Sequence, residues 1–150
     1  MSPQKTEKLL RKLFADQKFG VLATQHGETP FTSLVSFAAT DDLKQIIFVT
    51  GQATRKYAYL IANAHVSMLI DSRSNRDSDI VHAVAVTVTG IAEPVPAADR
   101  EASVRMYLSK HPYLEEFVRS PSTAILRINV EDYNVVSRFQ EVTRVRVAAD

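Results

Sequence analysis

The sequence predicts a mainly β fold with flanking helices, in which six to seven antiparallel strands close into a barrel. Short runs rich in β-branched and aromatic residues alternate with turn signals, as is typical of β proteins. A single helical segment interrupts the first four runs, so most connections are short enough for antiparallel hairpins. The 150 residues are 45% hydrophobic, which is enough to fill a barrel core. Because no repeat or linker is visible, we expect residues 1–150 to form a single domain.

The first half of the chain predicts two helices and four strands. Apolar residues recur at helical spacing near the N-terminus and predict a helix over residues 3–17. A threonine-capped segment with one apolar face predicts a second helix over residues 55–63. Turn signals bound the strands, which are predicted at residues 19–24, 31–39, 46–50 and 65–71.

The second half predicts a loop, a long strand, two helices and two further strands. Residues 72–79 are the most polar stretch and are expected to form an exposed loop. A long β run follows over residues 80–93, and Pro94 and Pro96 end it because proline donates no ladder hydrogen bond. The remaining elements are predicted as helices at 97–109 and 111–118, strands at 123–130 and 133–139, and a frayed basic end.

Composition narrows the class of protein. Lys and Arg number 18 and Asp and Glu 17, a formal charge of +1, which argues against a general nucleic-acid or membrane surface. The chain has no cysteine, which excludes disulfides, thiolate metal sites and a cysteine nucleophile. No apolar run approaches the ~20 residues of a membrane span, and the charged N-terminus does not resemble a signal peptide. We therefore expect a cytoplasmic protein.

Residues 46–56 join a β run, through a glycine and a threonine, to a helix that begins with two cations. Thr54 is a good N-cap because its hydroxyl can accept an unpaired N–H of the first helical turn. Arg55 and Lys56 oppose the helix dipole, whose positive end already lies there, so they favour a bound anion rather than helix stability. We predict a phosphate site at this helix N-terminus. The simpler interpretation is a pair of solvated cations after a cap.

Five short motifs lie in a fixed order within residues 19–93, about half of the chain. They are residues 27–31 (Gly-Glu-Thr-Pro-Phe), 48–50 (Phe-Val-Thr), 54–56 (Thr-Arg-Lys), 63–69 (Asn-Ala-His-Val-Ser-Met-Leu) and 89–93 (Thr-Gly-Ile-Ala-Glu). Their order and spacing resemble the pyridoxamine 5′-phosphate oxidase-like split-barrel family, whose members bind flavin mononucleotide (FMN). The resemblance implies a split β-barrel of the FMN-binding type.

The resemblance also implies a homodimer with FMN in a cleft between the subunits. Arg55 and Lys56 would hold the flavin phosphate, which suits a planar guanidinium fork and an ammonium point charge. Thr50 and Thr54 would add hydroxyl contacts. The segment beside the isoalloxazine ring would comprise Ser33, Leu34, Val35 and Ser36, with Val49 on the neighbouring strand.

Three departures from the family pattern argue against the vitamin oxidase itself. Pyridoxamine phosphate oxidases carry an arginine and a lysine at the positions of Ser33 and Ala38. A flavin-contacting glutamine is replaced in the region of Val84 and Ala85. The oxidases end in a tryptophan-containing substrate segment, whereas this chain has no tryptophan.

The four histidines show no metal-ligand spacing, so we expect no metal site. His26 and His111 are expected at the surface, and His65 is expected to pack in its strand. His82 follows the polar loop, near the expected mouth of the cleft, and is a candidate to touch a ligand. On the second helix, Tyr57 shares the apolar stripe and is expected in the core, whereas Tyr59 is expected at the surface.

The sequence thus predicts an FMN-binding protein, with flavin-dependent oxidoreductase activity toward an unknown small molecule. No side chain is identified as a catalytic acid or base. One alternative is a flavin-binding or redox-sensing module without turnover. Another is a haem-handling split-barrel protein, which would require a histidine such as His82 at the cleft; a deazaflavin cofactor is a further possibility.

Overall fold

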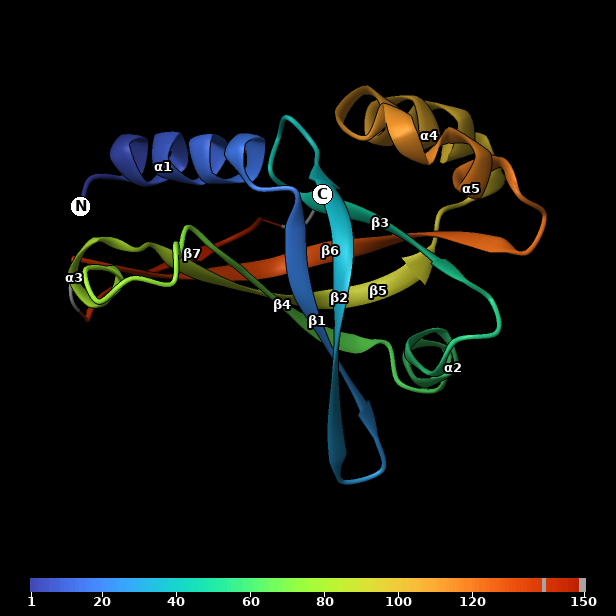
Figure 1. The fold of residues 1–150 in the computed structure, drawn as a ribbon, viewed down its shortest axis with the longest axis horizontal. Helices are drawn as coiled ribbons and strands as arrows, with labels where there is room; N and C mark the ends of the chain where they lie inside the picture. Colours follow the sequence, from blue (N-terminus) through green and yellow to red (C-terminus); the bar gives the residue numbers. More distant parts are fainter. Residues whose placement is uncertain (139, 149–150) are drawn as a thin grey trace.

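Seven antiparallel strands form the body of the molecule (Figure 1). The structure, a computed structural model, describes residues 1–138 and 140–148. The strand order is β3-β2-β1-β4-β5-β6-β7, and an additional β3–β6 pairing closes the first six strands into a barrel. In chain order the elements are α1 (Pro3–Asp16), β1 (Phe19–His26), β2 (Thr29–Ala39), β3 (Gln45–Gly51), α2 (Arg55–Ala62), β4 (His65–Asp71), α3 (Asp79–His82), β5 (Ala85–Pro94), α4 (Ala97–Lys110), η1 (Pro112–Leu114), α5 (Glu115–Arg119), β6 (Thr123–Ser137) and β7 (Glu141–Arg146). The predicted mainly β, antiparallel split barrel is confirmed.

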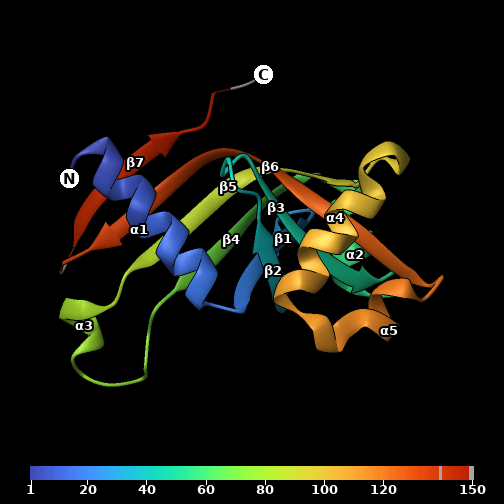
Figure 2. The ribbon, with the colours of Figure 1, turned by 90° about the horizontal axis from the view of Figure 1, so that it is seen from above.

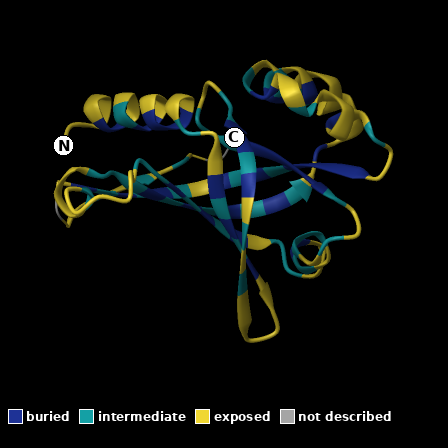
Figure 3. Ribbon diagram, viewed as in Figure 1, coloured by how far each residue is buried: buried dark blue, intermediate teal, exposed yellow. Residues whose placement is uncertain are grey.

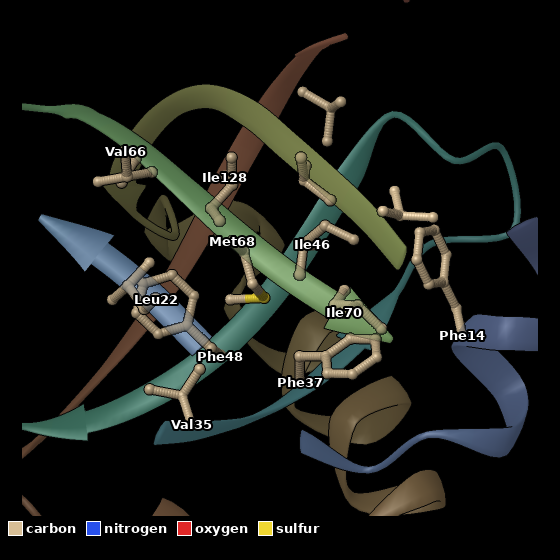
Figure 4. Close-up of a cluster of buried hydrophobic side chains, with 14 of the residues drawn as sticks. Phe14, Leu22, Val35, Phe37, Ile46, Phe48, Val66, Met68, Ile70 and Ile128 are labelled. Atoms are coloured by element: carbon tan, nitrogen blue, oxygen red, sulfur yellow. The ribbon is translucent and has the colours of Figure 1, made fainter. Parts of the chain in front are cut away.

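The barrel interior is filled by every second side chain of each strand. Because successive residues of a strand point to opposite faces, Leu22, Phe37, Phe48 and Met68 all face inward, each 0% exposed. Figure 4 shows these side chains directed toward one another from four different strands. Full burial of one such side chain contributes roughly 1.5–3 kcal/mol, so this cluster is the main source of stability for the barrel.

Helix α1 adds its apolar stripe to the same buried cluster. Ser2 caps the helix by accepting the N–H of Lys5 at 3.2 Å. Leu10, Leu13 and Phe14 point from the helix into the barrel core. The Phe14 ring meets the edge of Phe37 at 6.0 Å between centroids, which anchors the helix on β2.

Helices α4 and α5 form a second layer outside β3 and the end of β2 (Figure 2). Ile47 and Val49 point away from the barrel interior and pack with Val104 and Tyr107 of α4 and with Val118 of α5. Strand β3 is therefore buried on both faces. This explains why its sequence is a continuous apolar run rather than an alternating one.

The C-terminal strands differ from the prediction. Residues 123–130 and 133–139 were predicted as two strands, but β6 runs without interruption through Ser137, and Phe139 lies outside the described residues. Between the two predicted strands, at Glu131 and Asp132, the ladder with β5 shifts register opposite Thr89 and Gly90, and the strand continues. The predicted frayed end was also wrong for residues 141–146, which pair with β6 as β7.

The segment before β5 is the other difference. The sequence predicted a strand from residue 80, but α3 occupies Asp79–His82 and the strand begins at Ala85. The Asp79 carboxylate accepts the backbone N–H groups of Ser74 and Asn75 at 2.9 and 2.8 Å. This closes the loop into one helical turn, an arrangement that the apolar content of residues 80–84 did not indicate.

His111 was predicted at the surface and is instead 0% exposed. Its Nε2 lies 2.7 Å from the carbonyl oxygen of Phe37, so Nε2 carries the proton and donates it. Tyr107 packs against the ring at 4.8 Å. The following proline marks the end of α4 rather than an exposed turn, and His111 joins that helix end to β2.

Gly90 provides a test of the register shift. A Cβ at this position would lie 2.2 Å from the carbonyl oxygen of Asn129, a backbone atom that cannot move aside without breaking the ladder. We expect Gly90→Ala to lower the free energy of unfolding by about 3 kcal/mol in a denaturant titration. Gly51→Ala is the matched control, since the nearest atom to its Cβ would be 3.8 Å away. Equal stabilities of the two variants would contradict this account.

Burial of His111 predicts a loss of stability in acid. Desolvation lowers the pKa of His111 below its usual value, and the hydrogen bond to Phe37 opposes this only in part. Below about pH 6.5 the unfolded chain therefore binds a proton that the folded protein resists, and the free energy of unfolding falls as the pH falls. We expect the denaturation midpoint to decrease between pH 7.5 and 5.5, and His111→Gln to reduce that decrease because the amide still donates but does not titrate. His65→Gln, at an exposed position, should show the same decrease in denaturation midpoint as the unmodified protein.

Candidate functional site

The barrel is split between β2 and β3. These strands pair only where Phe37, Ala38 and Ala39 face Phe48, Ile47 and Ile46. Residues 29–36 of β2 pair with β1 alone, and residues 49–51 of β3 pair with β6 alone. Helix α2 lies beside this opening and buries Leu60 in the barrel core, at 1% exposure. The opening therefore brings together two strand edges without ladder partners and the N-terminus of one helix.

The loop between β3 and α2 is held by two threonine hydroxyls. Thr54 Oγ1 donates to the Gly51 carbonyl at 3.0 Å and accepts the Tyr57 N–H at 3.3 Å, which makes Thr54 the N-cap of α2. Thr50 Oγ1 lies 3.0 Å from Thr54 Oγ1, and Thr50 is only 2% exposed. Thr50 thus holds the Thr54 side chain in its capping position, and these hydrogen bonds fix the direction of the first turn of α2.

Arg55 and Lys56 are the first two residues of α2. Arg55 is exposed and Lys56 is half-buried. Among the residues that the structure describes, neither has an acidic partner, whereas Arg127 binds Glu93 at 2.7 Å and Asp99 at 3.1 Å. Two unpaired cations therefore add to the positive end of the helix dipole. This places two uncompensated positive charges beside the opening.

The predicted ring-facing segment divides between the two faces of β2. Ser33 and Val35 share the inward face with Leu22 and Phe37, whereas Leu34 points outward and is 67% exposed. The carbonyl of Ser36 accepts the Tyr107 hydroxyl at 3.4 Å, so α4 already uses that polar group. The side chain of Val49 packs under α4, which leaves only its backbone toward the opening. The polar groups of Ser33, Leu34 and Val35 remain the candidates for a ligand on β2.

Ser33 Oγ is buried and has no hydrogen-bond partner in the described part of the chain. A buried hydroxyl without a partner costs about 1–3 kcal/mol, so its presence at the opening favours a polar ligand group. The two cations and the N–H groups of the first turn of α2 form a donor set that suits a phosphorylated ligand. The residues present therefore fit an FMN phosphate.

The histidines do not gather at this opening. His82 lies on α3, at the opposite end of the long axis from α2 (Figure 1), rather than near the opening of its own chain. His65 is exposed rather than packed, and the buried His111 belongs to the α4 layer. No group of three or more His, Cys, Asp or Glu that could hold a metal ion occurs among the described residues.

Three aromatic rings join α2 to the β1–β2 hairpin, whose exposed tip projects from the barrel (Figure 3). Tyr59 stacks on His26 with centroids 4.7 Å apart and an interplanar angle of 18°. Phe31 and Tyr59 form an edge-to-face pair with ring centroids 5.4 Å apart. Tyr57 packs against the core as predicted, but Tyr59 is half-buried by these contacts rather than free at the surface. Helical periodicity did not indicate this, because the hairpin that covers Tyr59 lies outside the barrel core.

The comparisons with known proteins agree with the fold. The sequence profile of pyridoxamine 5′-phosphate oxidase matches residues 6–137, and the chain belongs to this family. No curated protein matches the chain. Each solved structure below shares less than 25% identity with it and therefore shows the fold alone.

Three such structures differ in what their names report. A haem-binding protein from Mycobacterium smegmatis has a TM-score of 0.84 at 17% identity, covering 97% of this chain but only 59% of its own length. General stress protein 26 from Bacillus anthracis has a TM-score of 0.72 at 16% identity, with 95% and 98% covered. An FAD-binding protein from Mesorhizobium loti has a TM-score of 0.68 at 16% identity, with 90% and 94% covered.

No helix within residues 1–138 and 140–148 is both long enough and apolar enough to cross a membrane.

Proposed function

We propose that residues 1–150 form one flavin-binding domain, in which the opening beside α2 binds FMN. The observation that carries the proposal is the pair of cations at the capped N-terminus of α2, neither with an acidic partner among the described residues. Arg55 would grip the phosphate with two parallel N–H donors, and Lys56 would add a point charge. The orphaned hydroxyl of Ser33 supports a polar ligand in the same opening.

The other predicted residues have separate parts in this proposal. Thr50 and Thr54 hold the loop that aims the first turn of α2. The unpaired edge of β2 at Ser33, Leu34 and Val35 would offer backbone N–H and C=O groups to the polar side of the ring. Val49 and Ser36 would bound the opening where α4 packs. FMN, when bound, supplies hydride or electron transfer, and the protein supplies position and electrostatics.

A redox enzyme acting on a small molecule is the function that we propose for such a site. We assign no side chain of the described residues as a catalytic acid or base. The chemistry would therefore depend on the cofactor and on how the opening admits a substrate. A flavin-binding module without turnover differs from this proposal in one measurable respect, the rate at which NADH or NADPH reduces the bound flavin.

We further propose a homodimer with the cofactor at the subunit interface. Leu34, Val21 and Leu69 form one cross-strand row on the outer face of β2, β1 and β4. Leu34 is 67% exposed at the end of this row, and Phe19 of β1 is 51% exposed. Exposed apolar residues on a sheet face favour burial against a second protein surface. A second copy suits this face because an isologous contact would place the same apolar row on both sides.

Haem binding is the competing function, because a structure of the same fold is named for it. The exposed histidines His26, His65 and His82 would be the candidate ligands, since His111 is buried and hydrogen-bonded. A deazaflavin would occupy the same phosphate site as FMN. The visible spectrum of the purified protein separates flavin from haem, because haem gives a sharp Soret band and a flavin does not.

Removal of Arg55 tests the phosphate site directly. We expect Arg55→Ala to weaken FMN binding by more than about tenfold, because a charge-assisted contact contributes roughly 1.5–3 kcal/mol. Arg105→Ala, at an exposed position on α4, is the matched control and should bind FMN like the unmodified protein. Titration of apoprotein with FMN, followed by fluorescence quenching, gives both affinities. Unchanged affinity in Arg55→Ala would remove Arg55 from the site.

Solution mass tests the proposed dimer. Light scattering should give twice the chain mass of 16.7 kDa. Phe19→Glu places a charge on the outer apolar face and should shift the mass toward the monomer, since burying an unpaired charge is costly. Phe117→Glu changes another exposed phenylalanine, on α5, and should remain dimeric. A monomeric mass for the unmodified protein at micromolar concentration would refute the dimer.

A further inference from the structure

The aromatic cluster of Tyr59, His26 and Phe31 is the contact that joins the β1–β2 hairpin to the exposed side of α2. Tyr59 lies one helical turn after Arg55, and Phe31 lies two residues before Ser33 on β2. The cluster therefore connects the helix that carries the proposed phosphate donors with the strand that carries the proposed ring-facing edge. Its two ring pairs have centroid separations of 4.7 and 5.4 Å.

No ladder hydrogen bond sets the distance between the first turn of α2 and the β1–β2 hairpin. Strand β2 pairs with β3 only from Phe37 onward, and its earlier residues 29–36 pair with β1 only. Leu60 anchors the opposite side of α2 in the core. The relative position of the hairpin and the first turn of α2 then depends on contacts outside the barrel, of which the stacked and edge-to-face rings are the specific ones.

We propose that Tyr59 is a positioning residue, which sets the distance between the phosphate-binding turn of α2 and the ring-facing edge of β2 through its contacts with Phe31 and His26. This inference rests on the proposed FMN site. The affinity for a ligand that contacts both the α2 turn and the β2 edge depends on the distance between them. If that distance is not already fixed in the free protein, binding must first order the two elements, and the affinity falls. The affinity for a ligand that touches only the α2 turn does not depend on that distance.

The test compares a spanning ligand with one that occupies only the helix N-terminus. We expect Tyr59→Ala to raise the Kd for FMN by about tenfold, because two aromatic contacts are lost. The Kd for inorganic phosphate, followed by phosphorus NMR, should change by less than about twofold, because the Thr54 cap and Arg55 remain. Tyr59→Phe keeps the ring and should bind both ligands normally. Phe117→Ala, an exposed ring on α5, is the control.

Each remaining outcome has a definite meaning. A parallel loss of FMN and phosphate binding in Tyr59→Ala would overturn the proposal, since Tyr59 would then merely hold α2 in place. Unchanged FMN binding would overturn it as well, while the proposed function would stand. If unmodified protein binds phosphate but not FMN, the proposed function fails first and the inference fails with it. If Tyr59→Ala does not fold, His26→Ala removes the stacked pair from the hairpin side and should weaken FMN binding selectively.

Discussion

The separation of β2 from β3 beyond the Phe37–Phe48 pair is the constraint on which the rest of this molecule depends. Two adjacent strands that continued to pair would satisfy each other's backbone groups and leave no opening beside α2. Instead, Phe37 and Phe48 pack in the core at the point of divergence, and α2 follows directly after β3 with Leu60 in the same core. The contact between Phe37 and Phe48 thus fixes the point where the opening begins. The unpaired edges of β2 and β3 bound the opening beyond it.

Charge and capping are concentrated where that opening meets α2. The hydroxyls of Thr50 and Thr54 form local hydrogen bonds, which give the first turn of α2 a fixed direction. Arg55 and Lys56 then add positive charge to the helix end that is already positive, without a described acidic partner. Arg127, by contrast, pairs with Glu93 and Asp99. Two adjacent cations without acidic partners at a capped helix N-terminus support a ligand role at α2 more strongly than the short motif does alone.

The second layer links the barrel to the helices through polar groups as well as apolar packing. Tyr107 and His111 both use backbone carbonyls of β2, at Ser36 and Phe37. Lys110 donates to the Phe14 carbonyl at 2.7 Å and lies 3.8 Å above the Phe37 ring, and burial lowers its pKa to about 8. The end of α4, the end of α1 and the base of the opening therefore meet at one point. A change in the protonation of His111 or Lys110 would act on the part of β2 that bounds the proposed site.

Local periodicity and capping chemistry were enough to predict the strand-rich barrel, the capped helix after β3 and the positions of Arg55 and Lys56. The sequence also indicated the family, through the order of five short motifs. Tertiary structure alone decided the burial of His111, the continuity of β6 past Glu131 and the pairing of β7. It also decided that Tyr59 packs against His26 and Phe31. The burial of His111, the continuity of β6 and the packing of Tyr59 depend on partners distant in the chain, whereas β7 pairs with the strand that precedes it. Hydrophobic periodicity carries no information about which segment covers a polar or exposed position.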